Sequence, residues 1–122
     1  MADVTQIVQR YLDTWNETDP ERRGALLETV WAEDGSYVDP LASARGHDEI
    51  SALIGGLHQQ VPGHVFRLLG EVDGHHTVCR FSWELAPDSG GESIAIGSDV
   101  AETDGDERIR SVIGFLDKAP QT

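Results

Sequence analysis

The hydrophobic pattern of this chain changes its period near "VPGH", and this change limits the possible folds more than any other feature. Before that turn, apart from one short strand, apolar residues recur three and four positions apart, as along one face of a helix. After it come four strand-like segments with turn-rich breaks: "HVFRLLGEV", "HTVCRFSWELA", "ESIAIGSDVAET" and "RIRSVIGFLD". This order predicts an α+β fold, with three helices packed on one face of a curved, mostly antiparallel sheet.

Three segments have helical spacing. The first is "DVTQIVQRYLDTWN", opened by a capping pair of Asp3 and Gln6, with an apolar stripe of Val4, Ile7, Val8, Tyr11, Leu12 and Trp15. The second is predicted to begin at Asp19-Pro20 and to bury Leu26, Leu27, Val30 and Trp31. The third is "GHDEISALIGGLHQQ", where Gly55 and Gly56 indicate either a close approach to another element or an early end. Before it, Asp34-Gly35 signals a turn, and "SYVDP" is a short strand that Pro40 ends.

Length and charge narrow the classes of function. The 122 residues fit one domain, so residues 1–122 are expected to form a single domain. The net charge of −13, with nine basic residues, disfavours binding to nucleic acids and to anionic membranes. No apolar run approaches the roughly 20 residues of a membrane helix, and no signal peptide is visible, so a cytoplasmic location is expected by default. The single cysteine, Cys79, is expected to be a buried, inert thiol.

The sequence lacks the usual motifs for metals and nucleotide cofactors. Its five histidines show no HExxH spacing and no cluster with cysteine, so no metal is expected. There is no GxGxxG and no P-loop, which predicts no nucleotide cofactor, and no GxSxG elbow of a serine hydrolase.

The stretch "GSYVDPLASARG" contains the residue that most invites a functional interpretation. Asp39 ends a short apolar run before Pro40, where it either shapes the turn or points into a pocket as an acid or base. Tyr37 shares its strand face, because side chains two apart point the same way. The apolar neighbours of Asp39, Val38 and Pro40, suit a partly buried carboxylate that acts as a base.

These features resemble the NTF2-like superfamily, a cystatin-like α+β barrel, and within it the SnoaL-like polyketide cyclases and ketosteroid isomerases. The segments "VQRYLDTWN" and "YVDPLASARGHDEI" carry the resemblance, which runs from about Val4 to Asp117. It implies a cone-shaped pocket and three site residues. Tyr11 stands where the isomerases carry a tyrosine and Asp39 where they carry the general base. Asp99, in "IGSDVAET", stands where they carry a second aspartate, a known case of a carboxylic acid kept protonated by its apolar site.

The resemblance implies a cofactor-independent acid–base enzyme that moves a proton next to the carbonyl of a small hydrophobic molecule. Asp39 would be the base, and Tyr11 and Asp99 would donate hydrogen bonds to the enolate oxygen. Isomerisation of a β,γ-enone and aldol-type closure of a polyketide both need this chemistry, and the residues do not choose between them. A homodimer formed through the outer sheet face is common in the superfamily. The expected pocket residues are Trp15, Tyr37, Leu57, His64, Phe66, Phe81, Trp83 and Phe115.

Two alternatives stay open. A non-catalytic ligand-binding protein or dimeric scaffold would leave Asp99 in solvent or paired with an arginine such as Arg67 or Arg110, whereas an isomerase-like site needs Asp99 dry and close to Tyr11. An epoxide hydrolase-like site would need Arg80 between the two aspartates. Strand alternation instead places Arg80 opposite Phe81 and Trp83, which argues against that arrangement.

Overall fold

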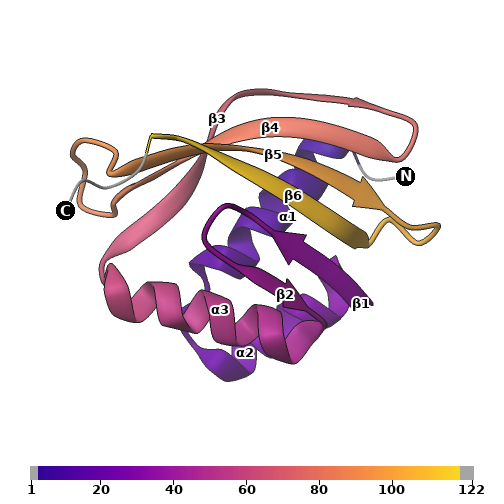
Figure 1. Ribbon diagram of the computed structural model, residues 1–122, viewed down its shortest axis with the longest axis horizontal. Coiled ribbons are helices and arrows are strands. Elements are labelled where there is room, and N and C mark those ends of the chain that lie inside the picture. Colours follow the sequence, from indigo (N-terminus) through magenta and orange to yellow (C-terminus); the bar gives the residue numbers. More distant parts are fainter. Residues whose placement is uncertain (1–2, 119–122) are drawn as a thin grey trace.

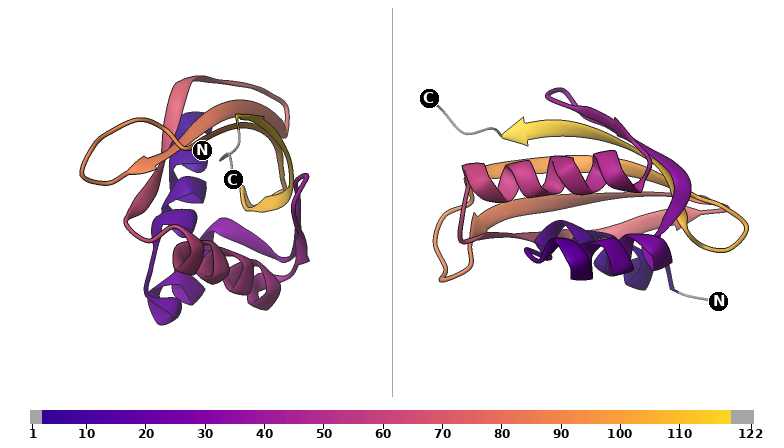
Figure 2. Two further views of the ribbon diagram at one scale, coloured as in Figure 1. Left: turned by 60° about the vertical axis from the view of Figure 1, so that its left-hand side comes forward. Right: turned by 90° about the horizontal axis from the view of Figure 1, so that it is seen from below.

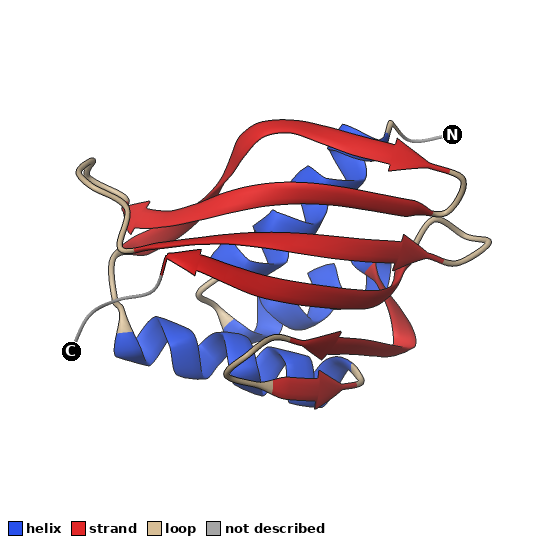
Figure 3. Ribbon diagram, turned by 45° about the horizontal axis from the view of Figure 1, so that its top comes forward, coloured by secondary structure: helices blue, strands red, loops and turns tan. Residues whose placement is uncertain are grey.

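Three helices and six strands make up residues 3–118, the part of the chain that the computed structural model describes. The helices lie together on one side of a curved sheet (Figures 1 and 3). In chain order the elements are α1 (Val4–Asn16), α2 (Pro20–Val30), β1 (Trp31–Val38), β2 (Ser43–Arg45), α3 (His47–Gln60), β3 (His64–His75), β4 (Val78–Pro87), β5 (Ala95–Thr103) and β6 (Ile109–Lys118).

The six strands form one sheet in the order β2-β1-β6-β5-β4-β3. Strand β1 runs parallel to β6, and every other neighbouring pair is antiparallel, so the prediction of a mostly antiparallel sheet is confirmed. The sheet curls over α1 and α3 without closing into a barrel (Figure 2). The curvature leaves a concave inner face toward the helices and a convex outer face.

The start of β1 differs from the sequence prediction. Helix α2 ends at Val30, and Trp31, predicted as its last buried residue, instead begins β1 opposite Ile109 of β6. The Asp34-Gly35 turn signal marks an irregularity inside this strand rather than its beginning. A Cβ on Gly35 would lie 2.7 Å from the Trp31 ring, so this glycine is needed to seat the indole. Packing of the Trp31 indole in the core therefore keeps the chain extended through Asp34-Gly35, although these two residues favour a turn.

The two glycines of α3 do not end that helix, which continues through them to Gln60. A Cβ on Gly55 would lie 3.1 Å from the guanidinium of Arg23 on α2, so the glycine marks a close approach between the two helices. Arg23 is buried there, and it donates to Ser51 Oγ and to the Glu17 carbonyl. The predicted close contact is confirmed, and the predicted early end is wrong.

The core lies between the inner sheet face and the apolar stripe of α1. The stripe residues from Ile7 to Trp15 are buried, as their helical spacing predicts. Cys79 is buried on the inner face of β4, and burial raises the pKa of its thiol, in line with an inert cysteine. Within residues 3–118, no helix combines the length and the apolar character needed to span a membrane.

Candidate functional site

A cavity of about 450 Å³ lies between the concave sheet face and helices α1 and α3. This volume falls in the range of roughly 300–1,000 Å³ that is usual for ligand pockets. Its wall is mostly apolar, and its polar side chains include Tyr11, Tyr37, Asp39 and Asp99. Among the described residues, no lysine, arginine or histidine lines it. The cavity therefore suits an uncharged, largely hydrophobic molecule.

Asp39, Gly114 and Asp99 lie in one row across three neighbouring strands. Asp99 on β5 pairs with Gly114 on β6, and Asp39 directly follows Val38, the last residue of β1, which pairs with Ile113. A Cβ on Gly114 would lie 2.7 Å from Asp99 Oδ1 and 3.4 Å from Asp39 Cβ. The missing side chain of this glycine is thus what lets both aspartates turn inward. Sequence reasoning missed Gly114, because its role depends on the register of the sheet.

Asp99 is dry and hydrogen-bonded to Tyr11. Its side chain belongs to a residue that is 2% exposed, and its Oδ2 accepts a hydrogen bond of 3.2 Å from the Tyr11 hydroxyl. Its Oδ1 is buried and makes no hydrogen bond of full geometry within the described residues, although the Trp83 side chain acts on the carboxyl as a donor. The two arginines considered as alternative partners pair elsewhere: Arg67 lies 4.0 Å from Asp88, and Arg110 lies 2.7 Å from Glu102. This is the environment that an isomerase-like site requires.

Burial sets the protonation of the two partners. It raises the pKa of Asp99 to about 6; the charge of Asp39 adds to the rise, and the donors of Trp83 and Tyr11 oppose it. Burial, followed by the nearby charge of Asp99, raises the pKa of Tyr11 well above its ordinary value. Tyr11 therefore keeps its proton near neutral pH, whereas Asp99 changes its charge just below neutrality.

Asp39 both lines the cavity and shapes the turn, so these two predicted placements occur together, while its role as an acid or base stays a prediction. Its Oδ1 accepts hydrogen bonds of 2.8 Å from the backbone N–H groups of Leu41 and Ala42, which fixes the loop after Pro40. Its Oδ2 accepts a hydrogen bond of 2.6 Å from the Tyr37 hydroxyl. Burial and this hydrogen bond raise the pKa of Tyr37, which therefore stays a donor. The turn holds the carboxylate in place at the cavity wall.

The other predicted pocket residues divide into two groups. Trp15, Tyr37, Leu57, Phe66 and Trp83 lie in the cavity wall. His64, Phe81 and Phe115 do not.

Each of the three exceptions has a local reason. Phe81 packs edge-on against Tyr11, with ring centroids 5.7 Å apart, and so belongs to the core behind the site. His64 turns back toward its own loop, with Nδ1 3.0 Å from the Pro62 carbonyl. Phe115 is 58% exposed on the outer sheet face, because neighbouring strand residues alternate and Gly114 and Leu116 face inward. The expectation for Phe115 is therefore wrong.

Arg80 takes no part in the cavity. Its guanidinium pairs at 3.1 Å with Asp73, and both side chains are largely exposed. This removes the bridging arginine that an epoxide hydrolase-like site would need. Within residues 3–118, no group of three or more histidine, cysteine or acidic side chains could hold a metal ion.

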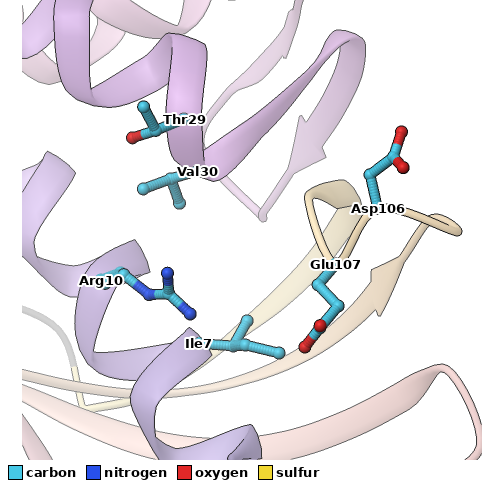
Figure 4. A pocket seen from close by; sticks show the side chains of 6 residues that line it. All are labelled: Ile7, Arg10, Thr29, Val30, Asp106 and Glu107. Atoms are coloured by element: carbon cyan, nitrogen blue, oxygen red, sulfur yellow. The ribbon is translucent and has the colours of Figure 1, made fainter. Parts of the chain in front are cut away.

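A second, smaller hollow of about 150 Å³ lies beside the N-terminal half of α1 (Figure 4). It is formed by Ile7 and Arg10 of α1, Thr29 and Val30 of α2, and Asp106 and Glu107 in the turn between β5 and β6. None of the predicted site residues lies in it, and it is too small for the ligands that the main cavity can hold.

Fold and site together define a class of protein with a helix-covered curved sheet and an acid-lined apolar pocket. The model of the SnoaL-like domain family matches residues 8–112. The chain therefore belongs to the SnoaL-like family, as its sequence indicated. Among curated proteins, no sequence matches this chain significantly.

Solved structures support the same assignment. A provisionally named isomerase of the SnoaL-like family from Agrobacterium tumefaciens is 44% identical, with a TM-score of 0.87, and the match covers 93% of this chain and 96% of that one. An NTF2-like protein from Cytophaga hutchinsonii is 9% identical, with a TM-score of 0.67 over 96% of this chain and 92% of that one. A provisionally named polyketide cyclase from Sinorhizobium meliloti is 16% identical, with a TM-score of 0.68 over 89% of this chain and 93% of that one. The predicted NTF2-like, or cystatin-like, fold is confirmed.

Proposed function

We propose that this protein is a cofactor-independent acid–base enzyme that moves a proton next to the carbonyl of a small, uncharged, hydrophobic compound. The observation that carries the proposal is the buried hydrogen bond between Tyr11 and Asp99 in the wall of a cavity that Asp39 also lines. The similarity to a provisionally named isomerase, at 44% identity, supports the isomerase form of this chemistry.

The three side chains take different roles in the proposed reaction. Asp39 removes a proton from the carbon next to the carbonyl, and the electron pair moves onto the carbonyl oxygen to give an enolate. Tyr11 and a protonated Asp99 donate hydrogen bonds to that oxygen. In isomerisation, Asp39 then returns the same proton to the far end of the conjugated system. In cyclisation, the enolate carbon instead attacks a second carbonyl of the same molecule, and the alkoxide that forms takes the proton back from Asp39.

Protonation of Asp99 controls both donors. When Asp99 is ionised, the Tyr11 hydroxyl donates to it across 3.2 Å and has no second proton for a ligand. When Asp99 is neutral, it can donate a proton of its own, and Tyr11 is free to turn to the ligand. Because the Asp99 pKa is about 6, the donor pair is complete mainly below about pH 6.

The experiment is a conversion assay with cyclohex-3-enone, a small β,γ-enone whose conjugated product absorbs in the ultraviolet. Asp39→Asn should lower kcat/KM by roughly 10² to 10⁴, the usual contribution of a general base. The rate of the unmodified protein should fall as pH rises above about 6, because Asp99 loses its proton there. The matched control is Asp88→Asn, which changes a carboxylate that is 76% exposed and should leave the rate unchanged. Equal rates with and without the Asp39 carboxylate would sink the proposal.

One observation favours a second candidate, a non-catalytic protein that binds a hydrophobic ligand. Asp39 already accepts three hydrogen bonds, from Tyr37 and from two backbone N–H groups. These bonds occupy acceptor positions on both carboxylate oxygens that a proton-abstracting base would use. A protein that binds the enone but converts it no faster than the Asp39→Asn variant would fit this candidate.

A further inference from the structure

The indole N–H of Trp15 is a buried donor that makes no hydrogen bond of full geometry within the described residues. Trp15 is 6% exposed and lines the cavity. Leaving such a donor unpaired in a folded protein costs free energy, because water would otherwise bond to it. An unpaired donor in the wall of a ligand cavity therefore calls for a functional explanation.

The surroundings of Trp15 hold its ring in one place. The ring packs against Tyr37 and Phe66, with centroids 5.2 Å and 5.5 Å away. His58 Nε2 lies 2.7 Å from the Trp15 carbonyl, and the side chain of Asn16 pairs with both backbone groups of Phe66, at 2.7 Å and 2.9 Å. The end of α1 is thus fastened to α3 and to β3 on either side of the indole. A donor held this way is preorganised for a ligand.

The same donor lies beside the proposed oxyanion site. Trp15 follows Tyr11 by one helical turn on the buried face of α1, so the two side chains are neighbours. The indole N–H acts as a donor toward the Tyr11 oxygen and so lowers the pKa of Tyr11 against the larger effect of burial, but it makes no hydrogen bond of full geometry there. The Tyr11 hydroxyl also donates to Asp99, whose Oδ1 likewise makes no hydrogen bond of full geometry. Both residues next to the Tyr11 hydroxyl therefore carry a buried polar atom with bonding capacity left for a ligand.

We propose that Trp15 Nε1–H is a third ligand-binding donor, which selects molecules carrying a ketone-type acceptor oxygen at the end that enters beside Tyr11. The Trp15 proposal rests on the proposed function in one respect, namely that the ligand is a carbonyl compound. The ligand class is a flat, uncharged hydrocarbon skeleton with one such oxygen. The Trp15 N–H donates a hydrogen bond to that oxygen, and Tyr11 and Asp99 donate to the same oxygen.

Trp31 provides a matched control within the same molecule. Its Nε1 is likewise buried without a hydrogen-bond partner among the described residues, and Trp31 is 0% exposed. However, Trp31 does not line the cavity. Replacing either indole by phenylalanine removes one buried, unpaired N–H, but only the Trp15→Phe change removes a donor that a ligand can reach.

The test uses two probes of the same shape, 2-acetylnaphthalene and 2-isopropenylnaphthalene, in which a CH₂ group replaces the carbonyl oxygen. Binding is measured by fluorescence titration. The unmodified protein should bind the ketone more tightly than the hydrocarbon. Trp15→Phe should weaken ketone binding by roughly tenfold, the effect of one buried hydrogen bond, and leave hydrocarbon binding nearly unchanged. Trp31→Phe should change neither.

Three results would overturn the inference. The first is an equal loss for both probes in Trp15→Phe, which would make Trp15 a packing residue only. The second is no change for either probe. The third is a ketone that binds the unmodified protein no more tightly than the hydrocarbon.

A spectroscopic measurement on the unmodified protein covers the case in which Trp15→Phe does not fold. The ketone, but not the hydrocarbon, should move the indole N–H proton resonance of Trp15 downfield, and an equal shift with both probes contradicts the inference. Neither measurement depends on turnover. A failed enone assay with a positive probe result would therefore reject the acid–base enzyme and keep the Trp15 site. Conversion of the enone with a negative probe result would keep the enzyme and reject the Trp15 site.

Discussion

The inner and outer faces of strands β5 and β6 each carry side chains that are unusual for their surroundings. The inner face, which is dry, carries the carboxyl group of Asp99. The outer face, which meets water, carries Val100, Ile113 and Phe115, which are 42%, 48% and 58% exposed. Both choices cost stability in an isolated protein, since buried charge and exposed apolar surface are each unfavourable. Each face is therefore best explained by something that binds to it.

The two faces also differ in how tightly they are built. On the inner face, Gly97 and Gly114 leave room only for the side chains that cover them, those of Trp83 and of the two aspartates. On the outer face, Val38, Ile113 and Val100 form an open row in register across β1, β6 and β5. We therefore expect substitutions on the inner face to change the free energy of unfolding strongly, and those on the outer face to change association instead.

The largest effect is expected for Gly97→Ala. The added Cβ would lie 2.2 Å from the Trp83 ring and 2.8 Å from the Phe115 carbonyl, so both side chain and backbone must shift. Overpacking of this kind costs about 3 kcal/mol of the free energy of unfolding, measured by urea denaturation. Gly24→Ala is the control, because a Cβ there meets nothing within 4 Å and alanine favours the helix. A similar small effect for both variants would show that the inner face is not tightly packed.

The next effect depends on pH and concerns Asp99. Its pKa of about 6 in the folded protein lies above the ordinary value near 4. The folded state therefore holds the Asp99 proton more tightly than the unfolded state does. The contribution of Asp99 to the free energy of unfolding is highest below about pH 4 and falls as the pH rises through 6. Asp99→Asn has no charge to bury. Its free energy of unfolding, relative to the unmodified protein, should therefore rise by up to about 3 kcal/mol between pH 4 and pH 8. Urea denaturation at each pH measures this difference, and a constant difference would mean that Asp99 is not buried as described.

The smallest effect on unfolding is expected on the outer face. We propose that its apolar row packs against a second copy of the chain. Ile113→Glu should then change the stability of the monomer by no more than about 0.5 kcal/mol, while shifting a dimer to a monomer in sedimentation equilibrium. Gln59→Glu adds the same charge at an exposed position of α3 and should leave the association unchanged. If the unmodified protein is a monomer at all concentrations, the proposed homodimer is wrong.

The residues that sequence reasoning placed correctly are those whose signal is local or comes from the family. The α1 stripe follows helical spacing, and the buried face of β4 follows strand alternation. The family resemblance singled out Tyr11, Asp39 and Asp99, which the fold brings to one cavity. By contrast, the prediction for Phe115 is wrong because its neighbour Leu116 lines the cavity, and strand alternation then turns Phe115 to the outer face.

Local patterns predict the three helices, the four strands after "VPGH" and most of their buried faces, because propensity, period and capping act within a few residues. Local patterns did not predict that β2 would form, that Trp31 would begin β1, that Gly114 would lie between Asp39 and Asp99, or that the Trp15 N–H would lie beside Tyr11. Each of these depends on strand register or on the packing of segments far apart in the chain. Such contacts are set by what fills the space between elements, and no local pattern of residues records that.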